Sequence, residues 1–171
     1  MACHSDQALA LIDTPSRAQN DILGGIRFTV NHAVVHSDQR FMPKRRSAWS
    51  SWVYLKQTQL DQSASLPPGI SLSYWMNNLQ PLSCSKPVFV TLNPHQAPDP
   101  ELTYDNYTFT HPKFDQSAIT AQSRMHEIQG QNQLWYCGAW QRYGFHEDGL
   151  QSAINLAAEF GITPPWQQSH A

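Results

Sequence analysis

The chain has 171 residues, 40% of them hydrophobic and 14% charged, with a formal net charge of −2 at pH 7. This length allows one sizeable core, and the near-neutral composition argues against a nucleic-acid-binding or membrane-surface protein. No apolar run approaches the ~18 residues of a membrane span, and three widely spaced cysteines without a CxxC pair predict reduced thiols in a cytoplasmic protein.

Two short helices are predicted at the start of the sequence. Ser5 is a candidate N-cap for a helical run over residues 6–12. A second helical segment follows Pro15 and ends at Gly24-Gly25.

The middle of the sequence predicts a sheet of about five antiparallel strands. β-branched and aromatic residues recur there with polar residues between them, a pattern typical of strands. Prolines and glycines separate these segments, most clearly over residues 61–69 and 93–100. The expected strands cover residues 26–37, 48–55, 70–76, 87–92 and 102–110.

The last third predicts a helix, a strand and another helix. Asp115 is a plausible N-cap for a helix over residues 115–128. The apolar run Leu134–Cys137 predicts a short buried strand, and Gly138 and Gly144 bracket the loop after it. Apolar residues at helical spacing begin at Leu150, and Gly161 ends the pattern.

This strand–loop–helix unit has two interpretations. It can be an ordinary unit of an α/β protein, because such units are common. It can also hold an anion or a polarised ring, because the free N–H groups of a helix's first turn point at such a ligand.

A resemblance favours the second interpretation. The segment GAWQRYGFHEDGLQSA (residues 138–153) resembles the C-terminal flavin-contacting segment of the FAD-dependent amine-oxidase-like oxidoreductases. More narrowly, it resembles predicted NAD/FAD-binding oxidoreductases encoded beside cyclopropane fatty acid synthases. The stretches ACHSDQALAL, MPKRRSAWSSWVYL, SLSYWMNNLQPL and VFVTLNP fit the same subfamily. The likeness covers nearly the whole chain, but only the later part of such an enzyme.

The resemblance implies an α+β fold with a mostly antiparallel substrate-binding sheet and a partial α/β piece of an FAD-binding domain. Residues 1–25 would be a segment returning to the FAD domain, so that the chain starts inside a domain. Residues 26–112 would form the substrate sheet. Residues 113–171 would supply the C-terminal helix and the strand–loop–helix unit of the FAD domain.

The same resemblance implies a cofactor site at the last helix. Main-chain N–H groups there would stabilise negative charge on a reduced flavin. Family members often carry an acidic residue after the first glycine, whereas this chain has Ala139. The expected cofactor-binding residues are Gly138, Ala139, Tyr143, Gly144, Phe145, His146, Glu147, Asp148, Gly149 and Leu150.

An aromatic set in the sheet is the second candidate. The residues would either form the sheet core or line a path for an apolar substrate toward the flavin, and they are Trp49, Trp52, Tyr74 and Trp75. Hydride transfer to a flavin needs no general base, and no residue stands out as one. The run His146-Glu147-Asp148 predicts no metal site, because consecutive helical residues project about 100° apart.

The sequence contains no GxGxxG, the turn that binds the ADP part of FAD. We therefore expect weak or no FAD binding by this chain alone. The missing half is explained by a truncated or split gene, by a misplaced start codon, or by a companion chain that carries the N-terminal half. The alternative function is a non-catalytic binding module, or a remnant, whose aromatic sheet face binds a partner or an apolar ligand.

Overall fold

The computed structural model describes residues 1–56 and 70–167, and the chain divides into two compact units. Unit 1 comprises Met1–Thr29 with His111–Ala171, and unit 2 comprises Val30–Thr110. The boundaries expected from the sequence fall after residues 25 and 112, and the compact units divide after residues 29 and 110. None of the described helices is both long and apolar enough to cross a bilayer.

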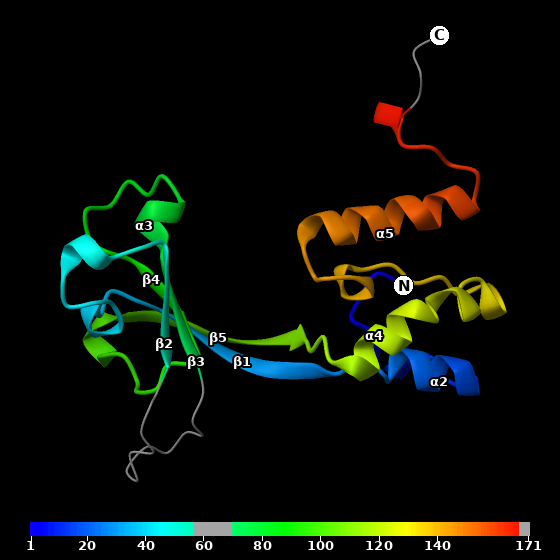
Figure 1. Ribbon diagram of the computed structural model, residues 1–171, viewed down its shortest axis with the longest axis horizontal. Coiled ribbons are helices and arrows are strands. Elements are labelled where there is room, and N and C mark those ends of the chain that lie inside the picture. Colours follow the sequence, from blue (N-terminus) through cyan, green and yellow to red (C-terminus); the bar gives the residue numbers. More distant parts are fainter. Residues whose placement is uncertain (57–69, 168–171) are drawn as a thin grey trace. The chain divides into compact units, whose positions relative to one another are not determined.

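Unit 2 is built on a five-stranded antiparallel sheet with strand order β2-β3-β4-β1-β5 (Figure 1). The prediction of an α+β fold with five antiparallel strands is confirmed. The loop predicted over residues 61–69 lies outside the described residues. The strands are β1 (Phe28–His36), β2 (Trp52–Lys56), β3 (Ile70–Trp75), β4 (Phe89–Leu92) and β5 (Thr103–Pro112).

The strand register gives the sheet two chemically different faces. Trp52 lies opposite Tyr74, which lies opposite Val90. Because side chains alternate along a strand, residues two positions away share the same face. We call this the open face, made of Trp52, Tyr54, Leu72, Tyr74, Val90 and Leu92. The covered face carries His36, Val53, Ser71, Ser73, Trp75, Phe89 and Thr91.

The core of unit 2 lies on the covered face. Met42, Val53 and Phe89 are buried together, and Trp49 and Trp75 pack against them. The chain between β1 and β2 supplies Met42 and Trp49, so this connection covers one side of the sheet. Short α3 (Met76–Leu79) follows β3.

Unit 1 is helical among the described residues. Its α-helices are α1 (Ser5–Ala10), α2 (Arg17–Leu23), α4 (Gln116–Ser123) and α5 (His146–Glu159). Single 3-10 turns occur in the chain at residues 39–41, 46–48, 100–102, 125–127, 131–133, 139–141 and 165–167. The buried core comprises Ala8, Ile22, Leu23, Ile26, Ala118, Ala121, Met125, Ile128, Tyr136 and Trp140.

Side-chain caps explain where α2 and α4 begin. Ser16 and Gln19 form a capping box on α2, with side chain to backbone distances of 3.2 and 2.8 Å. The Asp115 carboxylate accepts from Ala118 N–H at 3.1 Å, as predicted for the N-cap of α4. Gly161 has φ +70° and follows the end of α5, which confirms it as the stop.

Several predicted elements need correction. Ser5 is not the cap of α1, because His4 occupies that position and the buried Ser5 hydroxyl donates to Ile26 O. The helix predicted over residues 115–128 ends at Ser123 and continues as a 3-10 turn. The second predicted strand begins only at Trp52, after a 3-10 turn at Arg46–Ala48.

The predicted strand Leu134–Cys137 is also wrong, because this segment belongs to no sheet. Its backbone N–H and C=O groups form hydrogen bonds outside any sheet. The Gln129 side-chain amide donates to Tyr136 O at 2.7 Å and accepts from Tyr136 N–H at 2.8 Å, which replaces one neighbouring strand. Tyr136 is therefore buried without a neighbouring strand on this side, and Leu134, Trp135 and Cys137 are half-buried.

Candidate functional site

The segment Trp135–Cys137 lies beside the first residues of the chain. Cys137 N–H donates to Met1 O at 3.0 Å, and the Met1 amino group donates to Trp135 O. Met1 thus bonds the residues on either side of Tyr136, which is the hydrogen-bond pattern of two parallel extended segments. The two segments therefore run in the same direction, and each leads into a helix, α1 in one case and α5 in the other.

The buried Trp140 side chain holds this arrangement together. Its indole N–H donates to Cys3 O at 2.9 Å. Gly138 makes room for the ring, because a Cβ at Gly138 would lie 2.5 Å from Trp140 Nε1. The turn after Trp135–Cys137 thus depends on a glycine at position 138.

The apolar spacing indicates α5 only from Leu150 onward, and the structure gives its first turn. The helix begins at His146 with Phe145 as its N-cap, four residues before Leu150. The N–H groups of His146, Glu147 and Asp148 are therefore the first-turn donors that have no acceptor within the helix. Gly149 N–H is already bonded to Phe145 O at 3.2 Å.

Asp148 closes the loop that precedes the helix. Its carboxylate accepts from Tyr143 N–H at 3.2 Å and from Phe145 N–H at 3.0 Å, and Arg142 lies 3.7 Å from its other oxygen. The buried carboxylate is thus turned back onto its own loop. Its charge also complements the helix dipole.

Two of the predicted contact residues face inward. Gly138 N–H donates to the Ser152 hydroxyl at 2.8 Å, so this amide is not free for a ligand. Gly149 faces Ala139, whose Cβ would lie 3.7 Å from a Cβ added at Gly149. A bulky residue at Gly149 would therefore displace the loop rather than a ligand in front of the helix.

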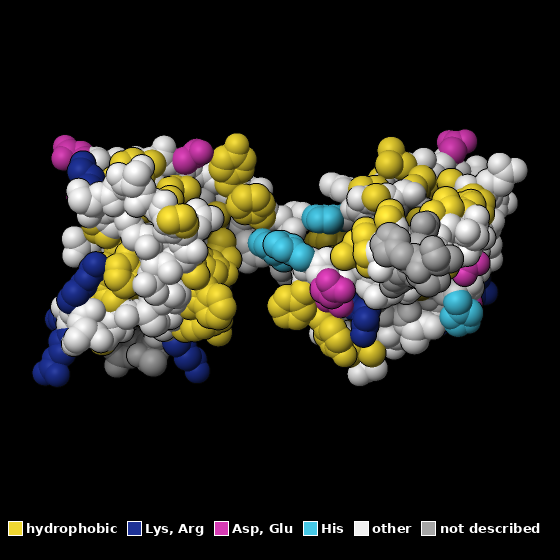
Figure 2. All heavy atoms as spheres, turned by 90° about the horizontal axis from the view of Figure 1, so that it is seen from above, with side chains coloured by type: hydrophobic (Ala, Val, Ile, Leu, Met, Phe, Trp, Pro, Cys, Tyr) yellow, Lys and Arg dark blue, Asp and Glu magenta, His cyan; other side chains and the backbone are white. Residues whose placement is uncertain are grey.

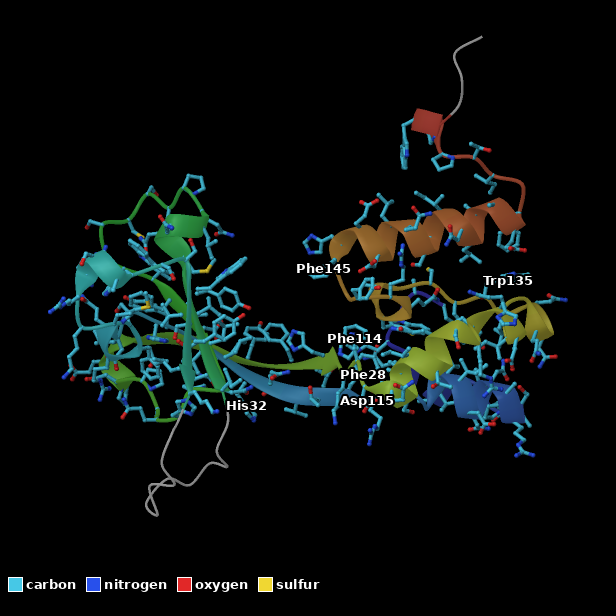
Figure 3. The ribbon with its side chains drawn as sticks, viewed as in Figure 1. Phe28, His32, Phe114, Asp115, Trp135 and Phe145 are labelled. Carbon is cyan, nitrogen blue, oxygen red and sulfur yellow. The ribbon has the colours of Figure 1, made fainter. Side chains whose placement is uncertain are left out.

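Exposed aromatic side chains flank the helix start. Tyr143 is 71% exposed and Phe145 is 70% exposed, and Phe145 lies at the N-terminal end of α5 (Figure 3). Phe114 packs against the loop, because a Cβ at Gly144 would lie 3.2 Å from its ring. These side chains are available to a ligand that reaches the start of α5.

The predicted substrate residues lie on two different faces of the sheet. Trp52 and Tyr74 are direct cross-strand neighbours on the open face. Trp49 and Trp75 are on the other side, in edge-to-face contact with ring centroids 5.3 Å apart, and the Arg46 guanidinium lies over both rings. The four residues therefore do not form one surface.

The open face exposes large apolar side chains. Trp52 is 58% exposed and Tyr54 is 67% exposed, and Figure 2 shows hydrophobic side chains gathered over part of unit 2. Burial, and secondarily the neighbouring Tyr54, raises the pKa of Tyr74, so its phenol stays protonated at neutral pH.

Sequence reasoning missed a buried polar group on the covered face. His36 Nε2 lies 2.7 Å from Thr91 Oγ1, which lies 2.8 Å from Ser73 Oγ, and His36 Nδ1 accepts from Asp38 N–H at 3.1 Å. Burial lowers the pKa of His36, and the negative charge of Asp38 opposes this shift in part. Because no local spacing distinguishes a buried histidine, the sequence carries no signal for it.

This histidine predicts a pH-dependent stability of unit 2. A folded pKa below the unfolded value of about 6.5 means that the unfolded chain binds more protons, so stability falls as the pH drops from 7 to 5. The cost is at most about 1.4 kcal/mol per pH unit crossed. Urea unfolding followed by tryptophan fluorescence should show this loss, and His36→Gln should flatten it.

The exposed His126 supplies a matched control. His126→Gln should leave the slope between pH 7 and 5 unchanged. Asp38 should not contribute to the slope of stability between pH 7 and 5, because the Arg40 side chain, chiefly, holds the pKa of Asp38 far below its usual range. A slope that survives His36→Gln would contradict the assignment.

Neither described cavity was predicted. Both lie in unit 2, one of about 500 Å³ between β1, β5 and the loop Ala97–Pro100, and one of about 380 Å³ beside Arg40 and Lys86. Over the described ranges 1–56 and 70–167, no three His, Cys, Asp or Glu side chains are placed to hold a metal ion. No known protein family matches the chain, and no curated protein matches it.

Proposed function

We propose that the chain is the C-terminal portion of a flavin-dependent oxidoreductase, with α5 contributing to the flavin site. The observation that carries this proposal is the parallel contact between Met1–Cys3 and Trp135–Cys137. Because of this contact, the turn that leads into α1 lies beside the turn that leads toward α5. The two segments form no sheet, but their direction matches that of the strands in parallel α/β sheets, whose ligands bind at the end that leads into the helices.

The residues at the α5 start fit a flavin ring. The first-turn amides of His146 and Glu147 can donate to its polar edge, and the helix dipole favours negative charge there. Tyr143 and Phe145 offer exposed rings for stacking. A bound flavin would accept a hydride from a C–N or C–C bond of the substrate.

The open face of the sheet supports an apolar substrate. Trp52 and Tyr54 offer large exposed apolar area, and Tyr74 adds a hydroxyl that can orient a polar end. Trp49 and Trp75 would support this sheet from its other side rather than contact the substrate.

The ADP part of FAD needs residues that this chain does not contain, since no GxGxxG occurs. We propose that a companion chain or further sequence carries that half, and that this chain alone binds FAD weakly or not at all. The three free cysteines, Cys3, Cys84 and Cys137, agree with a reducing, cytoplasmic compartment.

Replacing His146 with proline tests the flavin site. His146 is the first helical residue, where proline is tolerated but removes one N–H donor. If that amide bonds the flavin, binding of FMN should weaken by about two- to thirteenfold, as expected for one hydrogen bond of about 0.5–1.5 kcal/mol. Quenching of FMN fluorescence measures the affinity at up to millimolar protein.

Arg17→Pro makes the same change at the first residue of α2 and should leave FMN binding unaltered. FAD should bind no more tightly than FMN, and ADP should not compete. Equal affinities for the His146→Pro and Arg17→Pro chains would place the flavin elsewhere.

The second candidate is a non-catalytic module, and the exposed open face favours it. In that case an apolar fluorescent dye would bind wild-type protein and lose affinity in Trp52→Ser, while FMN would cause no change. Binding of both probes would favour the oxidoreductase.

A further inference from the structure

The larger cavity of unit 2 forms a groove along the outermost strand. Its walls are β5, the neighbouring residues His32–Val34 of β1 and the loop Ala97–Pro100, and its volume of about 500 Å³ lies in the range of ligand-binding sites. Tyr104 and Tyr107 contribute aromatic rings, and Pro98 and Pro100 contribute apolar surface. We call this the β5 groove.

The β5 groove is held in shape by hydrogen bonds. Asp99 N–H donates to the buried Asp38 carboxylate at 3.0 Å, which is fixed in turn by the Arg40 guanidinium. Thr103 Oγ1 donates to Asp99 O at 2.9 Å, and Tyr104 Oη donates to Ser37 Oγ at 2.9 Å. A wall tied down in this way needs little reorganisation on binding, which favours affinity.

The exposed backbone of β5, which borders the groove, indicates what kind of ligand would bind. β5 is the last strand in the sheet order, and its residues 104–111 are exposed. The amides of an edge strand alternate between its neighbour and the solvent. Both backbone groups of His32 bond Asn93 on the β4 side, and the His32 ring lies 3.2 Å from the Thr108 hydroxyl. Thr108 therefore faces a residue of β1 that offers β5 no backbone partner, which directs Thr108 N–H away from β1. Such outward-facing amides pair with another extended chain.

The acidic residues near the β5 groove indicate the charge of the ligand that would bind there. The described acidic residues of unit 2 are Asp38, Asp99, Glu101 and Asp105, all near this end of the sheet. Asp38 is paired with Arg40, whereas no cation among the described residues lies within salt-bridge distance of the other three. β5 contains no lysine or arginine, so a second copy pairing through its own β5 would offer these acids no complementary side chain, which disfavours self-association.

We propose that the β5 groove binds an extended peptide that carries lysine or arginine, as an added strand along β5. Apolar side chains at alternate positions of the peptide would enter the groove between Pro98 and Tyr104. Its basic side chains would lie near Asp105 and Glu101. This site is independent of the flavin site and does not need it.

A pair of fluorescein-labelled peptides tests the proposal. Lys-Val-Lys-Val-Lys-Val should bind the full chain at least about tenfold more tightly than Glu-Val-Glu-Val-Glu-Val in fluorescence anisotropy, because only the first complements the acids. Asp105→Lys should abolish this preference. Asp13→Lys, which makes the same charge change at an exposed residue of unit 1, should preserve it.

Amide hydrogen exchange distinguishes strand addition from charge attraction alone. Bound basic peptide should slow the exchange of Thr108 N–H. Equal binding of both peptides, no binding at millimolar peptide, or binding without protection of Thr108 would each overturn the proposal. So would a dimer in analytical ultracentrifugation that the peptide fails to dissociate, because a second copy would then occupy the edge.

Discussion

Gly138→Ala is expected to destabilise unit 1 by about 2–5 kcal/mol, the combined cost of a steric overlap and an unfavourable backbone conformation. The added Cβ would lie 2.5 Å from Trp140 Nε1, and Gly138 has φ +156°. Trp140 is buried and bonds Cys3 O, so it has no free direction in which to move. Urea unfolding of the two chains measures the difference.

Gly161→Ala separates the two contributions to that cost. Gly161 has φ +70° but no atom within 4 Å of an added Cβ, so only the conformational cost of about 1 kcal/mol remains. If both alanine variants lose the same stability, the overlap with Trp140 is not what fixes this turn.

Phe89→Ala should have an effect of similar size in unit 2, about 3–5 kcal/mol. Its side chain is completely buried, and its ring lies 5.5 Å from the ring of Trp49 and 5.6 Å from that of His36. Deleting it leaves a cavity beneath the connection that covers the sheet. The measurement is again the urea midpoint, followed by tryptophan fluorescence.

Trp52→Ala on the open face is the comparison. Trp52 is larger than Phe89 but more than half exposed, so its loss should cost less than about 1 kcal/mol. A larger loss for Trp52→Ala than for Phe89→Ala would mean that the core of unit 2 lies on the opposite face of the sheet from the one described.

The sequence predicted the sheet well because its pattern is local. Strands β1 to β5 were found from alternation and from the prolines and glycines between them. Which aromatic residues share a face was harder to see. Trp52 and Trp49 were placed in one set, but a 3-10 turn interrupts the extended chain between them, so strand alternation does not relate the two residues.

The site at α5 was predicted in part. The loop and the helix were found, but apolar spacing does not reveal that the Asp148 carboxylate accepts from the amides of the preceding loop. Leu134–Cys137 was mistaken for a strand because the prediction rested on its continuous apolar run, whereas the Gln129 side-chain amide bonds the backbone of Tyr136. The β5 groove depends on Asp38 and Asp99, which are 61 residues apart in sequence and meet only in the fold.

The most direct measurement of the flavin proposal is an NMR titration of the ¹⁵N-labelled full chain with FMN. The proposal predicts that the largest amide shifts occur at Tyr143, Phe145, His146 and Glu147, with Gly138 N–H still bonded to Ser152. Shifts confined to unit 2, or none at millimolar FMN, would show that the start of α5 is not a flavin site.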